Sequence, residues 1–503
     1  MKQAAAALGL LLILSISAST VPRLTVETED DSQLSAQIER IIARPEFRGA
    51  LWGIQASDAW DGSVLYEHDA MMSVVPASNT KIYTTAAALE QLGPEFRLVT
   101  RLYAQGTLRD GILDGSLFIR GAGDPTIAEN LEEYGAPGVL EAWASATRAA
   151  GIARIAGDVV GDDDVFDDVP YPRGWSWDDL TFYYAPEIGG LAYNQNVFDL
   201  VVEPRAAGMP GILRWTPSTS FLNVKNETVT IEPNARLVEG YDRRPSENFF
   251  VISSRGPAGR PDREALAVHN PTLYVSHRLL EVLQEAGVGV AGQARDVDDL
   301  SLKPAYADPS FFVVAEHASP PLSQIAALIN KRSHNLAAES LLKVLGVHAP
   351  HGAGNVAPAG SSAAGVARVG ETMARAGVDT SVVSLVDGSG LSRLNLVTAE
   401  ATAQMLAYMW NHPEGAVRAA FISSLAVGGV DGTLRNRFTG PAVHARVRAR
   451  TGLLTSVRSL SGYVETAGGR TVVFSIICNN HHTTESRVQE AQDAIVGILA
   501  RLP

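Results

Sequence analysis

The stretch PASNTKIYTTAAAL, residues 76–89, places Ser78 three residues before Lys81 in a run rich in alanine. Residues three apart lie on one face of a helix, so these two side chains can approach hydrogen-bonding distance. Pro76 marks the beginning of the predicted helix, where free N–H groups and the helix dipole favour developing negative charge. The stretch predicts a serine that an amine activates as a nucleophile; the simpler alternative is a serine that only caps the helix.

The choice of lysine at position 81 is unusual for this chain. Of its 41 basic residues only six are lysines, which leaves 35 arginines. A lysine buried beside other cations can lose its proton, whereas an arginine stays protonated. A lysine at position 81, in a chain that otherwise prefers arginine, suggests that this position needs a group that can accept a proton.

A second serine–lysine pair with the same spacing occurs at Ser340 and Lys343, in the stretch AESLLK. These residues fall inside a predicted helix, where the backbone N–H groups are already bonded and cannot stabilise an oxyanion. We therefore expect Ser78, and not Ser340, to be the reactive serine.

The composition is that of a folded protein with several domains. With 503 residues, of which 46% are hydrophobic and 19% charged, the chain is expected to form two to four domains. Its net charge of −14 argues against a nucleic-acid partner. The single cysteine, Cys478, excludes an internal disulfide, so packing must stabilise the fold.

The first residues, MKQAAAALGLLLILSISAST, carry one lysine, an apolar run and small residues near position 19. This order is typical of a secretory signal peptide, which we expect to span residues 1–19. The apolar run is shorter than the roughly 20 residues that cross a bilayer. We therefore predict an exported protein of the periplasm or cell envelope, either soluble or peripherally associated with the membrane.

Hydrophobic patterning predicts an α+β fold. Two strand-like runs flank the turn WDG at residues 60–62 and form a hairpin, and three further strands are expected between residues 444 and 478. Helical patterns follow Ser78 and return after residue 270, so the sheet should be mostly antiparallel and covered by helices. Between residues 96 and 269, short β-rich runs separated by Gly, Pro, Asp and Asn indicate inserted β-rich domains.

Two further short motifs accompany Ser78 and Lys81. The tripeptide Ser-His-Asn at 333–335 falls in a predicted turn between two helices, and Arg-Thr-Gly at 450–452 ends a predicted strand. Each tripeptide is common by itself. Their order after the Ser-x-x-Lys pair, on these elements, is typical of penicillin-recognising serine enzymes.

With these motifs the chain resembles the D-Ala-D-Ala carboxypeptidase/endopeptidase family of low-molecular-mass penicillin-binding proteins, in particular members with large insertions after the nucleophile helix. The resemblance includes RGAGDPT, GWSWDDLTFYYAPEIGGLAYNQN, DGSGLSR, GGVDGTLRNRF and TGLLTSVRSLSGYV. The 255 positions from Ser78 to Ser333 leave room for the insertion. The resemblance implies a β-lactamase/transpeptidase-like catalytic domain of residues 20–95 and 270–503, with residues 96–269 inserted.

The resemblance also implies an acyl-serine mechanism with a defined set of residues. The catalytic residues are Ser78, Lys81, Ser333 and Asn335. The substrate-binding residues are Arg450, Thr451, Gly452 and Leu453. Arg450 departs from the family's usual lysine and Leu453 from a small hydroxyl residue, but a guanidinium still presents positive charge to a carboxylate, and a leucine still supplies a backbone N–H. His334 is also unusual, and we expect an exposed turn histidine there.

The implied substrates are peptidoglycan stem peptides, with β-lactams as covalent inhibitors and with no metal or organic cofactor. The resemblance leaves open the balance between terminal D-Ala removal and cross-link cleavage, the third residue of the stem peptide and the oligomeric state. Two alternatives stay open at this point: a β-lactamase or esterase on the same fold, and an inactive peptidoglycan-binding scaffold, for which Arg450 is the only hint.

Overall fold

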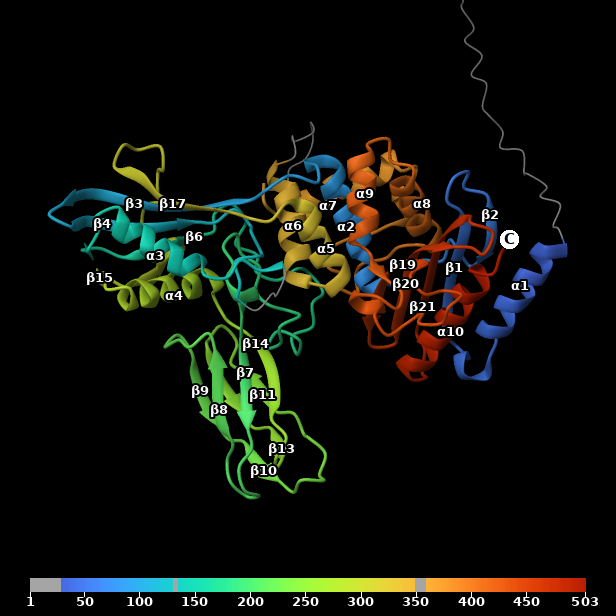
Figure 1. Cartoon of the computed structure of the whole chain (residues 1–503), viewed down its shortest axis with the longest axis horizontal. Helices are drawn as coiled ribbons and strands as arrows, with labels where there is room; N and C mark the ends of the chain where they lie inside the picture. Colours follow the sequence, from blue (N-terminus) through green and yellow to red (C-terminus); the bar gives the residue numbers. More distant parts are fainter. Residues whose placement is uncertain (1–28, 130–133, 349–358) are drawn as a thin grey trace, which may run out of the picture.

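The structure is a computed structural model that describes residues 29–129, 134–348 and 359–503, so the signal peptide expected at 1–19 lies outside the described residues. Its helices are α1 Glu29–Ile42, α2 Thr80–Leu92, α3 Val139–Ala149, α4 Pro271–Glu285, α5 Leu322–Arg332, α6 Asn335–His348, α7 Ser362–Arg375, α8 Ala399–Trp410, α9 Gly415–Ser424 and α10 Glu485–Leu499. The molecule is elongated, with one sheet near each end (Figure 1).

The first six strands are β1 Leu51–Asp58, β2 Val64–His68, β3 Val99–Arg109, β4 Ile112–Arg120, β5 Arg154–Ile155 and β6 Val159–Asp162. Eight strands follow between residues 197 and 267: β7 Val197–Glu203, β8 Ile212–Thr216, β9 Asn223–Asn226, β10 Val229–Ile231, β11 Tyr241–Arg243, β12 Phe249–Ile252, β13 Arg255–Pro257 and β14 Asp262–Ala267. The last strands are β15 Gly289–Val290, β16 Ala294–Asp296, β17 Phe311–Ala318, β18 Ala426–Val427, β19 Val447–Leu454, β20 Val457–Glu465 and β21 Thr471–Asn479.

The predicted antiparallel sheet is formed by strands from both ends of the chain. Its order is β18-β19-β20-β21-β1-β2, every neighbouring pair is antiparallel, and β1–β2 is the expected hairpin. The strand β21 is apolar on both sides because both faces of the sheet are covered. Phe474 and Ile476 pack in one core with α1 and α10, whereas Val473 and Ile477 pack in the other with α2 and with α5 to α9.

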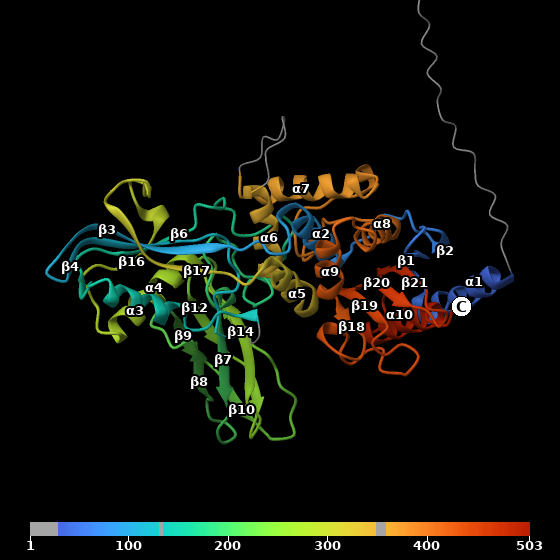
Figure 2. The ribbon, with the colours of Figure 1, turned by 45° about the horizontal axis from the view of Figure 1, so that its top comes forward.

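The helix α2, which follows Ser78, is the centre of the helical layer. It lies among α5, α6, α7, α8 and α9 and contacts each of them (Figure 2). Its residues from Thr80 to Leu89 are all buried. The alanines of this stretch are small enough to let the neighbouring helices approach closely. Gly93 ends the helix, as predicted, with a φ of 84° that favours glycine.

The inserted segment forms a second sheet at the other end of the molecule. Its strands run in the order β15-β5-β4-β3-β17, with β6 and β16 paired alongside, and α3 and α4 contribute to its core. Three small sheets, β14-β7-β8, β11-β12-β9 and β10-β13, form a module that extends downward in Figure 1. The insertion is therefore rich in strands, as expected, but also contains helices.

The inserted segment continues past the boundary expected at residue 269. Leu279 and Leu283 of α4 belong to the core of the second sheet, and β17 pairs with β3. An amphipathic helix shows the same periodicity whichever sheet it covers, so its sequence does not reveal its partner. We propose a boundary near Ala318, after which the chain returns through α5 to the first sheet.

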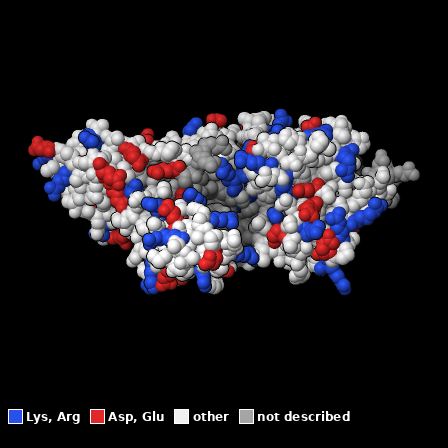
Figure 3. Space-filling view, turned by 60° about the horizontal axis from the view of Figure 1, so that its bottom comes forward, with Lys and Arg blue, Asp and Glu red and all other residues white. Residues whose placement is uncertain are grey.

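The described part of the chain contains no helix with the length and apolar character needed to span a membrane. On the face shown in Figure 3, acidic and basic side chains are interspersed over both ends of the molecule. The excess of negative charge in the sequence is therefore not gathered into one acidic surface on this face.

Candidate active site

Ser78 lies in a tight turn that directly precedes α2. A short 3-10 helix, Ala77–Asn79, forms the turn, and Ala77 has a left-handed backbone with a φ of 48°. The Ser459 hydroxyl donates a hydrogen bond of 2.6 Å to the Pro76 carbonyl, which ties the turn to β20. Ser78 therefore sits at a helix N-terminus, as the sequence predicts.

Gly452 allows β19 to pass directly against this turn. A Cβ atom at Gly452 would lie 2.1 Å from Ser459 Oγ and 2.9 Å from the Pro76 carbonyl oxygen. A larger residue would displace the turn that carries Ser78. The close approach brings the neighbouring residues of β19 to the edge of the pocket in front of Ser78.

Lys81 is fully buried on α2, and its Nζ atom has three partners. It lies 3.1 Å from Ser78 Oγ, 2.7 Å from Asn335 Oδ1 and 2.5 Å from the Ser389 carbonyl oxygen. Burial lowers the pKa of Lys81 well below its usual value, and the positive charge of Arg450 lowers this pKa further. These surroundings favour the neutral amine.

The partners of Lys81 fix the direction of its lone pair. A neutral amine has two hydrogens, and both Asn335 Oδ1 and the Ser389 carbonyl can only accept. The Asn335 amide is itself oriented, because its Nδ2 donates to the Tyr184 carbonyl at 2.6 Å. With both hydrogens engaged, the lone pair is left facing Ser78 Oγ, as a general base requires.

The second and third motifs meet beside Ser78. Ser333 follows α5 in a left-handed conformation, with a φ of 61°, and its Oγ lies 3.3 Å from Ser78 Oγ. Arg450 is fully buried and donates from Nη2 to Ser333 Oγ at 2.6 Å. Its Nε and Nη1 atoms have no hydrogen-bond partner among the described residues. Burial lowers the pKa of Arg450 to about 9, so the guanidinium is positive at neutral pH.

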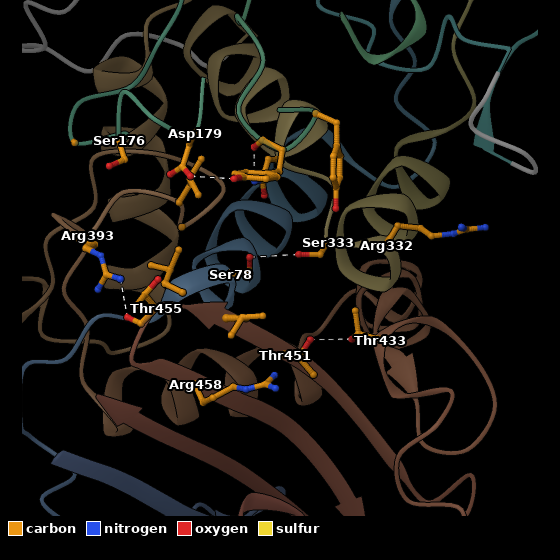
Figure 4. Close-up of a pocket in the computed structure, with 18 of the residues that line it drawn as sticks. Ser78, Ser176, Asp179, Arg332, Ser333, Arg393, Thr433, Thr451, Thr455 and Arg458 are labelled. Atoms are coloured by element: carbon orange, nitrogen blue, oxygen red, sulfur yellow. Dashed lines mark hydrogen bonds between the residues drawn. The ribbon is translucent and has the colours of Figure 1, made fainter. Parts of the chain in front are cut away.

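Ser78 opens into a pocket of about 670 Å³ (Figure 4). The pocket is lined by residues of the catalytic domain and by residues 174–184 of the inserted segment. Thr451 Oγ1 lies 2.9 Å from Thr433 Oγ1, and the half-exposed side chain of Leu453 lines the same pocket. Of the eight residues predicted from the motifs, five line this cavity: Ser78, Ser333, Asn335, Thr451 and Leu453. The other three contact these residues or their turn from behind: Lys81, Arg450 and Gly452. Other lining residues include Ser176, Asp178, Asp179, Tyr183, Tyr184, Arg332, Arg393, Thr455 and Arg458.

The loop 387–393, which carries the sequence DGSGLSR, supplies the Ser389 carbonyl to Lys81. Glu339 braces the loop by accepting from the Ser389 N–H at 2.7 Å, and Asp387 accepts from backbone N–H groups of the same loop. Burial and the Asp387 carboxylate raise the pKa of Glu339 to about 8. No sequence motif pointed to Ser389, because it acts through its backbone carbonyl.

The wall formed by residues 174–184 is a contribution of the inserted segment that the sequence did not predict. Tyr184 stacks on Phe182 with ring centroids 5.8 Å apart, and its hydroxyl donates to Asp179 Oδ1 at 3.0 Å. Trp175 Nε1 donates to Asp387 Oδ2 at 3.0 Å, which joins this wall to the 387–393 loop. The wall therefore contacts Asn335 through Tyr184 and the 387–393 loop through Trp175.

His334 is not the exposed turn histidine that the sequence suggested. It caps α6, because its Nδ1 accepts from the Ala337 N–H at 3.1 Å, while its Nε2 lies 2.8 Å from Gln195 Oε1. Burial lowers the pKa of His334 to about 4. The ring is therefore neutral at physiological pH, and its partners fix its tautomer.

The second serine–lysine pair is structural, as predicted. Ser340 is buried within α6, and Lys343 Nζ donates to Asp167 Oδ1 at 2.7 Å. Neither residue lines the Ser78 pocket.

Three exposed carboxylates, Asp164, Asp168 and Asp298, form the one group with metal-ligand spacing in the described part of the chain. Lys303 pairs with Asp164 at 2.9 Å and also with Asp298. None of these residues lines the Ser78 pocket, so we assign the group no part in the site.

Comparison with known proteins agrees with this geometry. The model of the D-Ala-D-Ala carboxypeptidase 3 (S13) family matches residues 34–502. The chain belongs to this family. One relative, the D-alanyl-D-alanine carboxypeptidase of Actinomadura sp. (strain R39), is 33% identical over 485 residues, which cover 93% of this chain and 85% of the relative. The D-alanyl-D-alanine carboxypeptidase DacB of Haemophilus influenzae is 26% identical over 451 residues, 88% of each chain.

A solved structure shows the same fold. Penicillin binding protein 4 from Haemophilus influenzae matches with a TM-score of 0.78 at 22% sequence identity, over 94% of this chain and 100% of that chain. The predicted transpeptidase-like fold with inserted domains is thus confirmed. The S13 family assignment makes the chain a serine-type D-Ala-D-Ala carboxypeptidase and favours it over the esterase and scaffold alternatives.

Proposed function

We propose that this S13 enzyme cleaves the D-Ala-D-Ala bond of peptidoglycan stem peptides through an ester on Ser78. Ser78 Oγ attacks the carbonyl carbon between the two alanines while its proton passes to Lys81 Nζ. The C–N bond then breaks, the leaving nitrogen takes up a proton, and D-alanine departs. Water next attacks the ester, which releases the shortened peptide and restores the Ser78 hydroxyl.

The set of contacts made by Lys81 Nζ is the observation that carries this proposal. Both Lys81 hydrogens meet acceptors, and Ser78 Oγ lies 3.1 Å from Nζ. Ser333 supports the second half of the step, because its hydroxyl lies 3.3 Å from Ser78 Oγ and can relay the proton toward the leaving nitrogen. The Oδ1 and Nδ2 atoms of the Asn335 amide each have a partner. We therefore assign Asn335 the task of orienting Lys81, in addition to the substrate contact that the family resemblance implies.

Arg450 and Thr451 bind the terminal carboxylate of the substrate in this proposal. The buried guanidinium of Arg450 has two nitrogens without a partner among the described residues, and hydrogen bonds to a carboxylate are roughly twice as strong as neutral ones. A carboxylate at this position explains a preference for a free peptide end. The N–H groups of Ser78 and Leu453 form the oxyanion hole, since both residues line the pocket.

We also propose that β-lactams acylate Ser78 and stay attached. A β-lactam presents a strained amide and a carboxylate to the same groups. Class A β-lactamases use a dedicated Glu to activate the deacylating water. The described residues that line the Ser78 pocket include Asp178 and Asp179 but no Glu, so we expect slow release of the acyl group.

The test is the release of D-alanine from a synthetic peptide that ends in D-Ala-D-Ala. The wild-type enzyme should release D-alanine, the Ser78→Ala variant should release none, and the matched Ser340→Ala variant should behave as the wild type. Release by Ser78→Ala at the wild-type rate, or no release by the wild type, would contradict the proposal. Mass analysis after incubation with cross-linked muropeptides then separates terminal D-Ala removal from cross-link cleavage.

Export of the enzyme completes the proposal, because its substrate lies outside the cytoplasm. The support is the leader-like sequence of residues 1–19, with one lysine, an apolar run and small residues at its end. N-terminal sequencing of the protein secreted from its host should find a mature end near residue 19 or 20. An intact Met1 on the mature protein would contradict this part of the proposal.

A further inference from the structure

Residues 194–196 of the inserted segment form a strained turn close to the catalytic site. Asn194, Gln195 and Asn196 all have left-handed backbones, with φ values of 50°, 62° and 58°. Such conformations are uncommon outside glycine, and strain of this kind persists only where surrounding contacts determine it. Three consecutive cases therefore call for a physical reason.

The neighbours of Gln195 hold the turn in place. The Asn194 N–H donates to the Ile127 carbonyl at 2.8 Å, and Asn196 Nδ2 donates to the Glu187 carbonyl at 2.8 Å. Both asparagines are buried, whereas Gln195 is only partly buried. The asparagines account for the shape of the turn, and Gln195 is the residue that this shape presents to the catalytic domain.

Gln195 contacts the middle residue of the second motif. Its Oε1 lies 2.8 Å from His334 Nε2, and His334 Nδ1 accepts the Ala337 N–H that opens α6. Since Nδ1 is an acceptor, the ring hydrogen must be on Nε2, and Gln195 Oε1 must accept it. The Ala337 N–H thus sets the tautomer, and Gln195 holds the orientation of a ring that lies between Ser333 and Asn335.

The orientation of His334 matters because its two neighbours act at the reaction centre. Ser333 has a left-handed backbone and reaches Ser78 Oγ, while Asn335 begins α6 and orients Lys81. A rotation of the His334 ring would remove the α6 cap and loosen the turn that carries both side chains. Misplacement of catalytic groups by about 1 Å can cost about a hundredfold in rate.

We propose that Gln195 is a positioning residue of this enzyme: the inserted segment uses its left-handed turn to hold His334, and through His334 to hold Ser333 and Asn335 in register with Ser78. A glycine at position 195 would suit the backbone better but could not reach the ring. The side chain, and not the turn itself, is then what the site requires. The proposal rests on the acyl-serine function proposed above.

The test compares acylation rate with stability. The second-order rate constant for acylation by a fluorescent penicillin, and the melting temperature, are measured for the wild type, Gln195→Gly and Gln195→Asn. Both substitutions suit a left-handed backbone and leave the His334 Nε2–H without its acceptor. We expect an acylation rate about tenfold to a hundredfold lower, with a melting temperature within a few degrees of the wild type. The matched control Asn194→Gly changes the same turn and should keep the wild-type rate.

A double-mutant cycle shows whether the effect passes through His334. Asparagine is a good helix cap without a ring to hold, so in the His334→Asn background Gln195→Gly should change the rate less than about threefold. Equal acylation rates for the wild type and both Gln195 variants would overturn the inference. It would also be overturned if Gln195→Gly lowered the rate by the same factor in the His334→Asn background as in the wild type. A wild-type protein that penicillin does not acylate would instead refute the proposed function.

Discussion

Lys81 Nζ lies 2.7 Å from Asn335 Oδ1, although 254 positions of sequence, including the inserted segment, separate the two residues. The contact explains why a chain that uses 35 arginines keeps a lysine at position 81. An arginine could present charge there, but it could not offer a lone pair to Ser78. In the proposed mechanism, position 81 needs a group that accepts a proton, whereas position 450 needs only a positive charge.

Substitution of Lys81 by arginine should abolish acylation while keeping a cation at the site. A guanidinium keeps its proton at neutral pH and cannot take the Ser78 proton, and loss of the base at a cost of roughly 4 kcal/mol slows the step at least about a thousandfold. The rate of labelling by fluorescent penicillin measures this loss. A near-normal rate in Lys81→Arg would show that another group, with His334 the first to test, takes the proton.

Substitution of Arg450 by lysine should have a small effect by comparison. Lysine restores the family's usual residue and keeps the positive charge that a substrate carboxylate needs. We expect kcat/KM for D-alanine release to stay within about tenfold of the wild type. The uncharged Arg450→Gln variant is the control, and it should lose far more than tenfold; similar values for the two variants would contradict a role in carboxylate binding.

Cys478 should be inert in the native protein. The thiol is free and fully buried in β21, and burial raises its pKa to about 12. Iodoacetamide at pH 8 should therefore label the unfolded protein but not the folded one. A reducing agent should also leave the melting temperature unchanged, because one cysteine cannot form an internal disulfide. A large shift on reduction would indicate a bridge between molecules.

Acid should weaken the fold in part through His334. The pKa of this residue is about 4 in the folded protein against an ordinary value of 6.5, so the unfolded chain binds more protons between these values. Stability should then fall as the pH decreases from about 6.5 to about 4. Unfolding free energies at pH 7 and pH 4.5 should differ by about 2 kcal/mol less in His334→Asn than in the wild type. If the unfolding free energies of the two proteins changed equally with pH, this contribution of His334 would be excluded.

The sequence was sufficient for the parts of the site that local motifs encode. Ser78 and Lys81 share one helical turn, Ser333 and Asn335 flank one short connection, and the choice between Ser78 and Ser340 follows from their positions on their helices. In each case a few neighbouring residues fix the backbone, so their spacing carries the information.

Other parts of the site could not be predicted, because they depend on tertiary contacts. Ser389 and Tyr184 act through carbonyl oxygens, which every residue has. The contact of Gln195 with His334 depends on how the inserted segment packs against the second motif. The return of α4 and β17 to the inserted sheet was missed for the same reason, since periodicity shows that a helix has an apolar face but not what covers it.

The most direct test of the central claim is the position of the acyl group. The enzyme is incubated with penicillin and digested, and the modified peptide is located by mass spectrometry. The account predicts an adduct on the peptide that contains ASNTK, at Ser78, and none on the peptide that contains AAESLLK. An adduct on Ser340, or on any residue other than Ser78, would contradict the account.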